Sequence, residues 1–169
     1  MGEARPGALS TLVATDELAR HPGWRVFDCR HDLVKHELGE QQYRESHIPG
    51  AAFAHLDRDL SAPTNGANGR HPLPDPQAFI AWLGAQGLRP TDQVVAYDGG
   101  PGAMAARLWW MLRWVGHDAV AVLFLGRHVR DVAEPADAGV RGAQHFFVER
   151  NRVLGGAVDT VIETIQLGV

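Results

Sequence analysis

Short apolar runs alternate with amphipathic segments along the first 125 residues of the chain. Apolar runs rich in β-branched and aromatic residues predict strands, and apolar positions three or four apart predict helices. Runs that are apolar throughout are typical of strands buried on both faces of a parallel sheet. We predict strands at residues 9–14, 24–29, 51–54, 94–97 and 119–125, and helices at 16–21, 39–44, 76–86 and 103–115. This alternation predicts a three-layer α/β fold with a mainly parallel central sheet flanked by helices.

Several predicted helix ends carry residues that suit capping. Thr15 precedes an acidic first turn and is the expected N-cap of the first helix. Asp75 and Pro76 form an N-cap and first-position pair for the helix that ends before Gly87. Gly116 is the expected stop of the last long helix.

The chain divides into two parts by composition. Residues 8–125 contain all the predicted strands and form the expected domain, which is long enough to bury a core. Residues 126–169 mix charges, glycine and alanine, and we interpret them as a divergent C-terminal segment that is at most partly ordered. A terminal amphipathic helix is predicted at residues 158–167.

A tight loop follows the strand at residues 94–97. The strand ends at Asp98, and before the next helix the loop consists of Gly99, Gly100, Pro101, Gly102 and Ala103. Such a loop at a helix N-terminus can bind an anion, because its backbone N–H groups are free to point inward. In the alternative interpretation Asp98 only caps the loop and the glycines only make the turn. Both alternatives stay open, but this loop is the place where we expect a site.

Composition excludes several classes of protein. The net charge of −4 provides no basic field, so nucleic acid is not an expected partner. No apolar run is long enough to span a membrane and the first residues lack the apolar core of a signal peptide, so we expect a cytoplasmic protein without a membrane partner.

Cysteine and histidine usage restricts the possible chemistry. Cys29 is the single cysteine, which excludes an internal disulfide, and we interpret it as a packing residue rather than a nucleophile. The nine histidines show neither an HExxH motif nor a paired spacing. We interpret them as mostly surface or locally hydrogen-bonding residues, and we expect neither a metal nor a cofactor.

Several motifs occur in an order that resembles the rhodanese family. They are Phe27-Asp28-Cys29-Arg30, Tyr43-Arg44-Glu45-Ser46-His47-Ile48-Pro49-Gly50-Ala51, His71-Pro72-Leu73-Pro74, Val94-Val95-Ala96-Tyr97-Asp98 and Ala105-Ala106-Arg107-Leu108-Trp109-Trp110. The chain is most similar to the N-terminal domain of two-domain thiosulfate and 3-mercaptopyruvate sulfurtransferases, from about residue 12 to residue 123. The resemblance implies a rhodanese-like fold, sulfur transfer and a small sulfur-containing anion as the substrate of the intact protein.

The resemblance also implies roles for individual residues. In active members the glycine loop begins with a cysteine that becomes a persulfide, and Asp98 stands at that position here. We therefore expect this chain to be inactive alone and to need a cysteine-bearing rhodanese domain as its partner. Asp57 and His71 match an Asp and a His that are proposed to support a relay in mercaptopyruvate-type members. In the alternative interpretation Asp57 is a surface cap and His71 braces a proline turn.

Two departures from the family pattern bear on the extent of the protein. The second rhodanese domain is missing, and the Asp-Gly-Gly segment that follows the last matched strand in the family is replaced after Leu123. We expect a truncated or frame-shifted two-domain enzyme.

The sequence is also compatible with two other functional classes. The chain can be a non-catalytic binding or regulatory module that docks a partner protein or associates with itself. It can also be a phosphatase in which Asp98 accepts a phosphoryl group, but Gly100 stands where a second, magnesium-binding Asp is needed.

Overall fold

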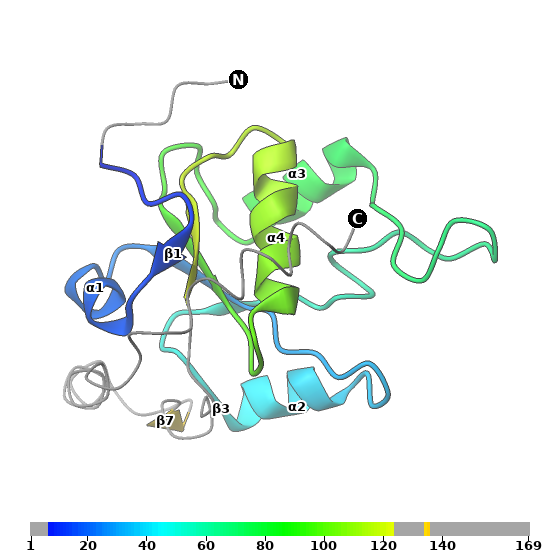
Figure 1. Ribbon diagram of the computed structural model, residues 1–169, viewed down its shortest axis with the longest axis horizontal. Coiled ribbons are helices and arrows are strands. Elements are labelled where there is room, and N and C mark those ends of the chain that lie inside the picture. The colour runs from blue at the N-terminus through cyan, green and yellow to red at the C-terminus, as the bar shows by residue number, and fades with distance from the viewer. Residues whose placement is uncertain (1–6, 124–133, 136–169) are drawn as a thin grey trace.

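The computed structural model describes residues 7–123 and 134–135 of the chain (Figure 1). Its central sheet contains five strands in the order β1-β6-β5-β2-β4. All pairs within this sheet are parallel. The strands are β1 (Leu12–Val13), β2 (Arg25–Asp28), β4 (Ala52–Phe53), β5 (Val94–Tyr97) and β6 (Val120–Leu123). The predicted parallel α/β architecture is therefore confirmed.

Helices cover both faces of the sheet and make three layers (Figure 1). Helix α1 (Thr15–Arg20) packs on one face, and α3 (Pro76–Ala85) and α4 (Ala103–Trp114) pack on the other. Helix α2 (Leu38–Glu45) lies beyond the carboxyl ends of the strands, next to the N-terminus of α4. Helix α2 thus borders the carboxyl edge of the sheet and contributes side chains to the hollow there.

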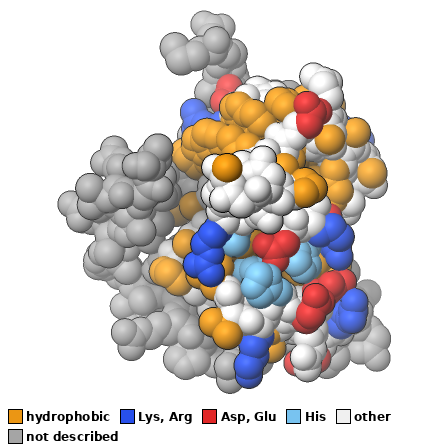
Figure 2. Space-filling model, turned by 90° about the vertical axis from the view of Figure 1, so that its right-hand side faces the viewer, with side chains coloured by type: hydrophobic (Ala, Val, Ile, Leu, Met, Phe, Trp, Pro, Cys, Tyr) orange, Lys and Arg blue, Asp and Glu red, His pale blue; other side chains and the backbone are white. Residues whose placement is uncertain are grey.

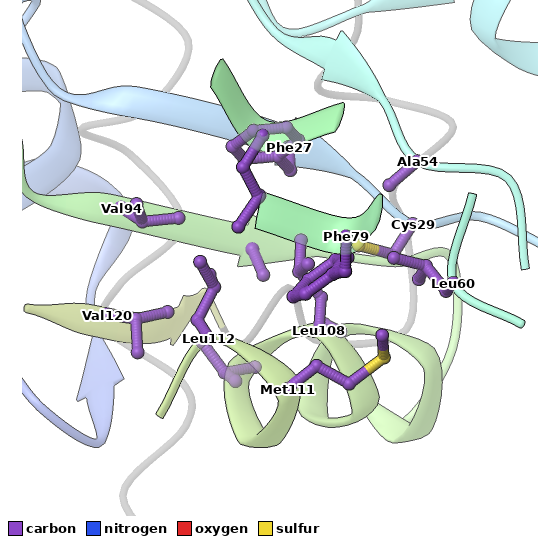
Figure 3. Packing of buried hydrophobic residues seen from close by; sticks show 14 of the residues in the cluster. Phe27, Cys29, Ala54, Leu60, Phe79, Val94, Leu108, Met111, Leu112 and Val120 are labelled. Atoms are coloured by element: carbon purple, nitrogen blue, oxygen red, sulfur yellow. The ribbon is translucent and has the colours of Figure 1, made fainter. Parts of the chain in front are cut away.

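The core is divided by the alternation of side chains along each strand. In β5, Val94 and Ala96 pack against α3 and α4, whereas Val95 and Tyr97 face α1. These four side chains are at most 1% exposed, as expected for a central parallel strand. Figure 3 shows the first cluster, in which Leu108 and Leu112 of α4 point toward the sheet.

Two predicted helix ends are confirmed and one is wrong. The Asp75 side chain accepts a hydrogen bond from the N–H of Ala78 at 2.9 Å, and Gly116 adopts φ +91° after α4. Thr15 is not the N-cap, because the N–H of Leu18 donates to the carbonyl of Ala14 and the helix therefore begins one residue earlier. The Thr15 hydroxyl provides no cap.

The first predicted strand, at residues 9–14, is longer than the strand observed. The observed strand spans only Leu12–Val13 because only these residues pair with β6. The prediction for residues 119–125 corresponds to β6, and residues 124–125 lie outside the described part.

A second, small sheet pairs β3 (Ser46–His47) with β7 (Glu134–Pro135) in antiparallel orientation. The rest of the predicted divergent segment, including the helix expected at residues 158–167, lies outside the described residues. Within residues 7–123 and 134–135, every helix is too short or too polar to cross a lipid bilayer.

Candidate functional site

The candidate site lies at the carboxyl edge of the sheet, where loops from β2, β4 and β5 meet. A hollow of about 310 Å³ opens there. Arg30 and His31 from the loop after β2 form one wall, Leu38 and Gln42 of α2 form another, and the loop from Asp98 to Met104 forms the third. Parallel strands place their following loops at the same edge, which is why distant segments converge here.

The Asp98 carboxylate occupies the centre of its own loop. Its Oδ1 accepts hydrogen bonds from the N–H groups of Gly100 at 2.8 Å and Gly102 at 3.1 Å. Its Oδ2 accepts from the N–H groups of Met104 at 2.9 Å and Ala105 at 3.1 Å, which belong to the first turn of α4. The side chain also gains from the positive end of the helix dipole.

This geometry decides between the two interpretations of the loop. The N–H groups converge as an anion-binding loop requires, but the prediction that they are free is wrong because Asp98 accepts from four of them. Gly102 sits at φ +96°, a conformation that favours glycine and allows the turn to close around the carboxylate. Asp98 is therefore a loop cap, and a carboxylate cannot form a persulfide.

Cys29 is a packing residue, as predicted. It is 1% exposed and lies beside Leu60 and Phe79 in the core (Figure 3). Burial raises the pKa of the Cys29 thiol well above its usual value, and the nearby carboxylates of Asp28 and Asp98 raise it further. Because the thiolate is the nucleophile, this thiol is unsuited to sulfur transfer.

A buried polar network supports the floor of the site. Arg30 donates to the Asp28 carboxylate, with Nη2 and Oδ2 2.6 Å apart, and also to the carbonyl of Ser46 at 2.6 Å. The Tyr97 hydroxyl donates to the same carboxylate at 2.6 Å and accepts from the N–H of Ile48. Burial and the Asp28 carboxylate both raise the pKa of Tyr97 well above its usual value. The network fixes the Phe27-Asp28-Cys29-Arg30 motif to the neighbouring strands.

The structure brings Asp57 and His71 together although 14 positions separate them. His71 Nε2 lies 3.8 Å from Asp57 Oδ1. Arg107 of α4 holds this loop by donating to the carbonyls of Leu60 at 2.8 Å and His71 at 2.9 Å. The arginine therefore fixes the backbone on both sides of the polar loop between those residues.

Two further histidines, which the sequence reasoning missed, contact the same carboxylate. His36 Nδ1 lies 2.7 Å from Asp57 Oδ2, and His31 Nε2 lies 3.9 Å from that oxygen. Figure 2 shows histidine side chains gathered around an acidic side chain on one face of the molecule. The expectation of mostly surface or locally hydrogen-bonding histidines is wrong for His31, whose side chain is 1% exposed and whose ring nitrogens have no hydrogen-bond partner among the described residues.

The surroundings of this cluster lower the pKa values of His31, His71 and Asp57. Burial lowers the pKa of His31 below its usual value, and the opposing effect of Asp57 is smaller. Burial and Arg107 lower the pKa of His71. Burial raises the pKa of Asp57, but the hydrogen bond from His36 and the neighbouring imidazoles outweigh this and lower it overall.

Comparison with known proteins agrees with this architecture. A profile of the Rhodanese-like domain family matches residues 12–127, which is more than half of the chain. The chain belongs to the rhodanese family. This membership confirms the resemblance drawn from the motifs.

Sulfurtransferases are among the relatives of this rhodanese chain. A probable 3-mercaptopyruvate sulfurtransferase of Pseudomonas aeruginosa is 55% identical over 117 residues, which cover 66% of this chain and 41% of that protein. Thiosulfate/3-mercaptopyruvate sulfurtransferase 1 of Arabidopsis thaliana is 44% identical over 136 residues, with 72% and 34% covered. The solved 3-mercaptopyruvate sulfurtransferase of Leishmania major superimposes with a TM-score of 0.64 at 36% identity, with 72% and 33% covered. The chain spans less than half the length of these relatives.

Proposed function

We propose that this chain is the cysteine-free rhodanese domain of a thiosulfate or 3-mercaptopyruvate sulfurtransferase, and that another rhodanese domain supplies the persulfide-forming cysteine. The occupied loop carries the proposal. The Asp98 carboxylate accepts hydrogen bonds from four N–H groups of the loop. The family resemblance implies the nucleophile of active members at this position. Cys29, the single cysteine of the chain, is buried. In this proposal the domain assists the reaction, and the reacting thiolate belongs to the other rhodanese domain.

The supporting groups in this proposal are His71 and Asp57. When a cysteine thiolate attacks the sulfur of 3-mercaptopyruvate, the carbon–sulfur bond breaks and its electron pair leaves with pyruvate as the enolate. The substrate thiol must lose a proton and the departing carbon must gain one. An uncharged His71 beside Asp57 can take the first proton and return it to the carbon. When thiosulfate is the donor, the leaving group is sulfite, and no proton transfer to carbon is needed.

The test uses the purified chain with a separately produced rhodanese domain that carries cysteine at the loop position of Asp98. Sulfur transfer to cyanide is measured with each donor, with the chain alone, the second domain alone and both together. We expect the chain alone to be inactive with both donors. We expect transfer from 3-mercaptopyruvate to rise at least tenfold when both domains are present.

Variants separate the proposed relay from simple docking. His71→Ala and Asp57→Asn should abolish most of the gain with 3-mercaptopyruvate and leave the thiosulfate rate of the mixture unchanged. His21→Ala, which alters an exposed histidine directly after α1, is the matched control. If the chain produces no gain with either donor, the proposal fails. Activity of the chain alone that is lost in Cys29→Ser would likewise overturn it.

A non-catalytic binding module is the second candidate. Trp110 and Trp114 lie on the outer face of α4, 45% and 39% exposed, with their rings stacked 5.9 Å apart. Exposed aromatic pairs of this kind are typical of interaction surfaces. Under this alternative the two domains associate, the Trp110→Ala variant weakens the association, and the rates with both donors stay at the level of the second domain alone.

A further inference from the structure

We propose that His31, His36 and Asp57 bind one divalent transition-metal ion of the zinc type. One nitrogen from each imidazole and one carboxylate oxygen lie within 4.8 Å of one another. Imidazole nitrogens and a carboxylate are ligands that zinc prefers, whereas magnesium and calcium prefer oxygen ligands alone. The inference goes beyond sulfur transfer and does not depend on it.

Within residues 7–123 and 134–135, His31 lacks the partners that a buried imidazole needs. Its side chain is 1% exposed, and among the described residues neither Nδ1 nor Nε2 has a hydrogen-bond partner. A buried imidazole without partners is costly, because its polar atoms lose water and gain nothing in return. Nε2 faces Asp57 at 3.9 Å, a separation that is too long for a hydrogen bond. A metal ion between the two groups supplies the missing interaction.

The three ligand atoms are spaced close to the distances that a tetrahedral ion requires. Tetrahedral zinc with bonds of about 2.0–2.1 Å places neighbouring ligand atoms about 3.4 Å apart. His36 Nδ1 and Asp57 Oδ2 must open from 2.7 Å, and His31 Nε2 and Asp57 Oδ2 must close from 3.9 Å. The His36 side chain is 52% exposed and can turn by this amount. Metal binding through Nδ1 requires the His36 tautomer that carries its proton on Nε2, because a ligand nitrogen needs a free lone pair.

The charge around Asp57 also favours a cation. Within the described part of the chain, no lysine or arginine forms an ion pair with Asp57, and its partners there are imidazoles. The adjacent Arg58 is engaged instead by Asp59, with Nε and Oδ1 3.0 Å apart. The negative charge of Asp57 is therefore not neutralised by a basic side chain among the described residues and remains for a cation.

The neighbouring residues define the limits of the site. Glu37, Glu40 and His55 form a second group with the same ligand types. His55 Nδ1 accepts the N–H of Asp57 at 3.2 Å, so its proton lies on Nε2 and the ring is a poor ligand. His71 Nε2, which also has no hydrogen-bond partner among the described residues, lies 3.8 Å from the other Asp57 oxygen. It can take the remaining position or leave it to water.

The experiment measures metal binding by the tag-free, chelator-treated chain, with no sulfur donor present. Zinc is titrated against a chromophoric chelator, and cobalt is used as a spectroscopic probe of tetrahedral coordination. We expect one high-affinity equivalent, tetrahedral cobalt bands and a higher melting temperature with zinc. Magnesium at the same concentration should not compete.

Matched variants locate the ion. His36→Ala and Asp57→Asn should each lower zinc affinity at least tenfold, and both side chains are exposed enough for the fold to survive. His21→Ala and the pair His128→Ala with His145→Ala should bind as the unmodified chain does, because these histidines are not among the three ligands. Absence of stoichiometric binding overturns the proposal. Equal affinities in His36→Ala, Asp57→Asn and His21→Ala overturn it as well, whatever the result of the sulfur-transfer assays.

Discussion

Replacing Asp98 tests the structure of the glycine loop directly. Asp98→Ala removes the acceptor of four N–H groups, of which those of Gly102 and Ala105 are in buried hydrogen bonds. Each buried N–H left without a partner costs about 1–3 kcal/mol, so the two together predict a loss of about 2–6 kcal/mol in the free energy of unfolding. Asp98→Asn keeps one acceptor oxygen and should lose about half as much.

The same variant should open an anion site. In Asp98→Ala the N–H groups still converge at the start of α4, where an oxyanion can replace the missing carboxylate. The assay is urea unfolding in sodium sulfate and in sodium chloride of equal ionic strength. Sulfate stabilises most proteins by exclusion from their surface, so the unmodified chain measures that general effect. We expect an additional gain only in Asp98→Ala.

Asp75→Ala is the matched control, because Asp75 caps α3 by accepting a single N–H on the surface. It should lose about 1 kcal/mol and show no additional sulfate effect. The interpretation of the loop is refuted if Asp98→Ala costs no more than Asp75→Ala. It is also refuted if sulfate stabilises both variants equally.

Three further predictions concern residues outside the loop. Gly39→Ala should destabilise the chain by more than about 2 kcal/mol in urea unfolding, because the new Cβ would lie 2.0 Å from the backbone oxygen of Arg30. Gly84→Ala is the control: its Cβ meets no atom within 4 Å, so the substitution should be neutral or stabilising. Cys29 should react with a thiol reagent only after unfolding, and rapid reaction of the native chain would contradict its burial. Burial lowers the pKa of His117, so the unfolded chain binds more protons and stability should fall as the pH drops below about 6.5. His117→Gln should reduce that fall in melting temperature between pH 7 and pH 5, and an unchanged pH profile would show that His117 does not contribute.

The cluster of histidines around Asp57 could not be predicted from the sequence pattern. His31, His36 and His71 carry no recognisable spacing, and the first two lie in a polar stretch that predicts little more than the short helix after them. They meet at Asp57 because the loops after β2 and β4 leave neighbouring strands at the same edge of the sheet. Contacts of this kind depend on strand order, and strand order is not encoded in local periodicity.

In the glycine loop, some features were predictable from the sequence and others depend on the tertiary structure. Its glycines, the strand before it and the apolar helix after it were predictable, because backbone freedom and side-chain burial follow from residue type. The position of the Asp98 carboxylate among the N–H groups depends on the path of the closed loop, which only the tertiary structure determines. By itself, then, the sequence determined the α/β architecture, the family and the lack of a loop cysteine, since these depend on local pattern and composition. Which groups Asp98 and Asp57 contact was decided by packing between elements far apart in the chain.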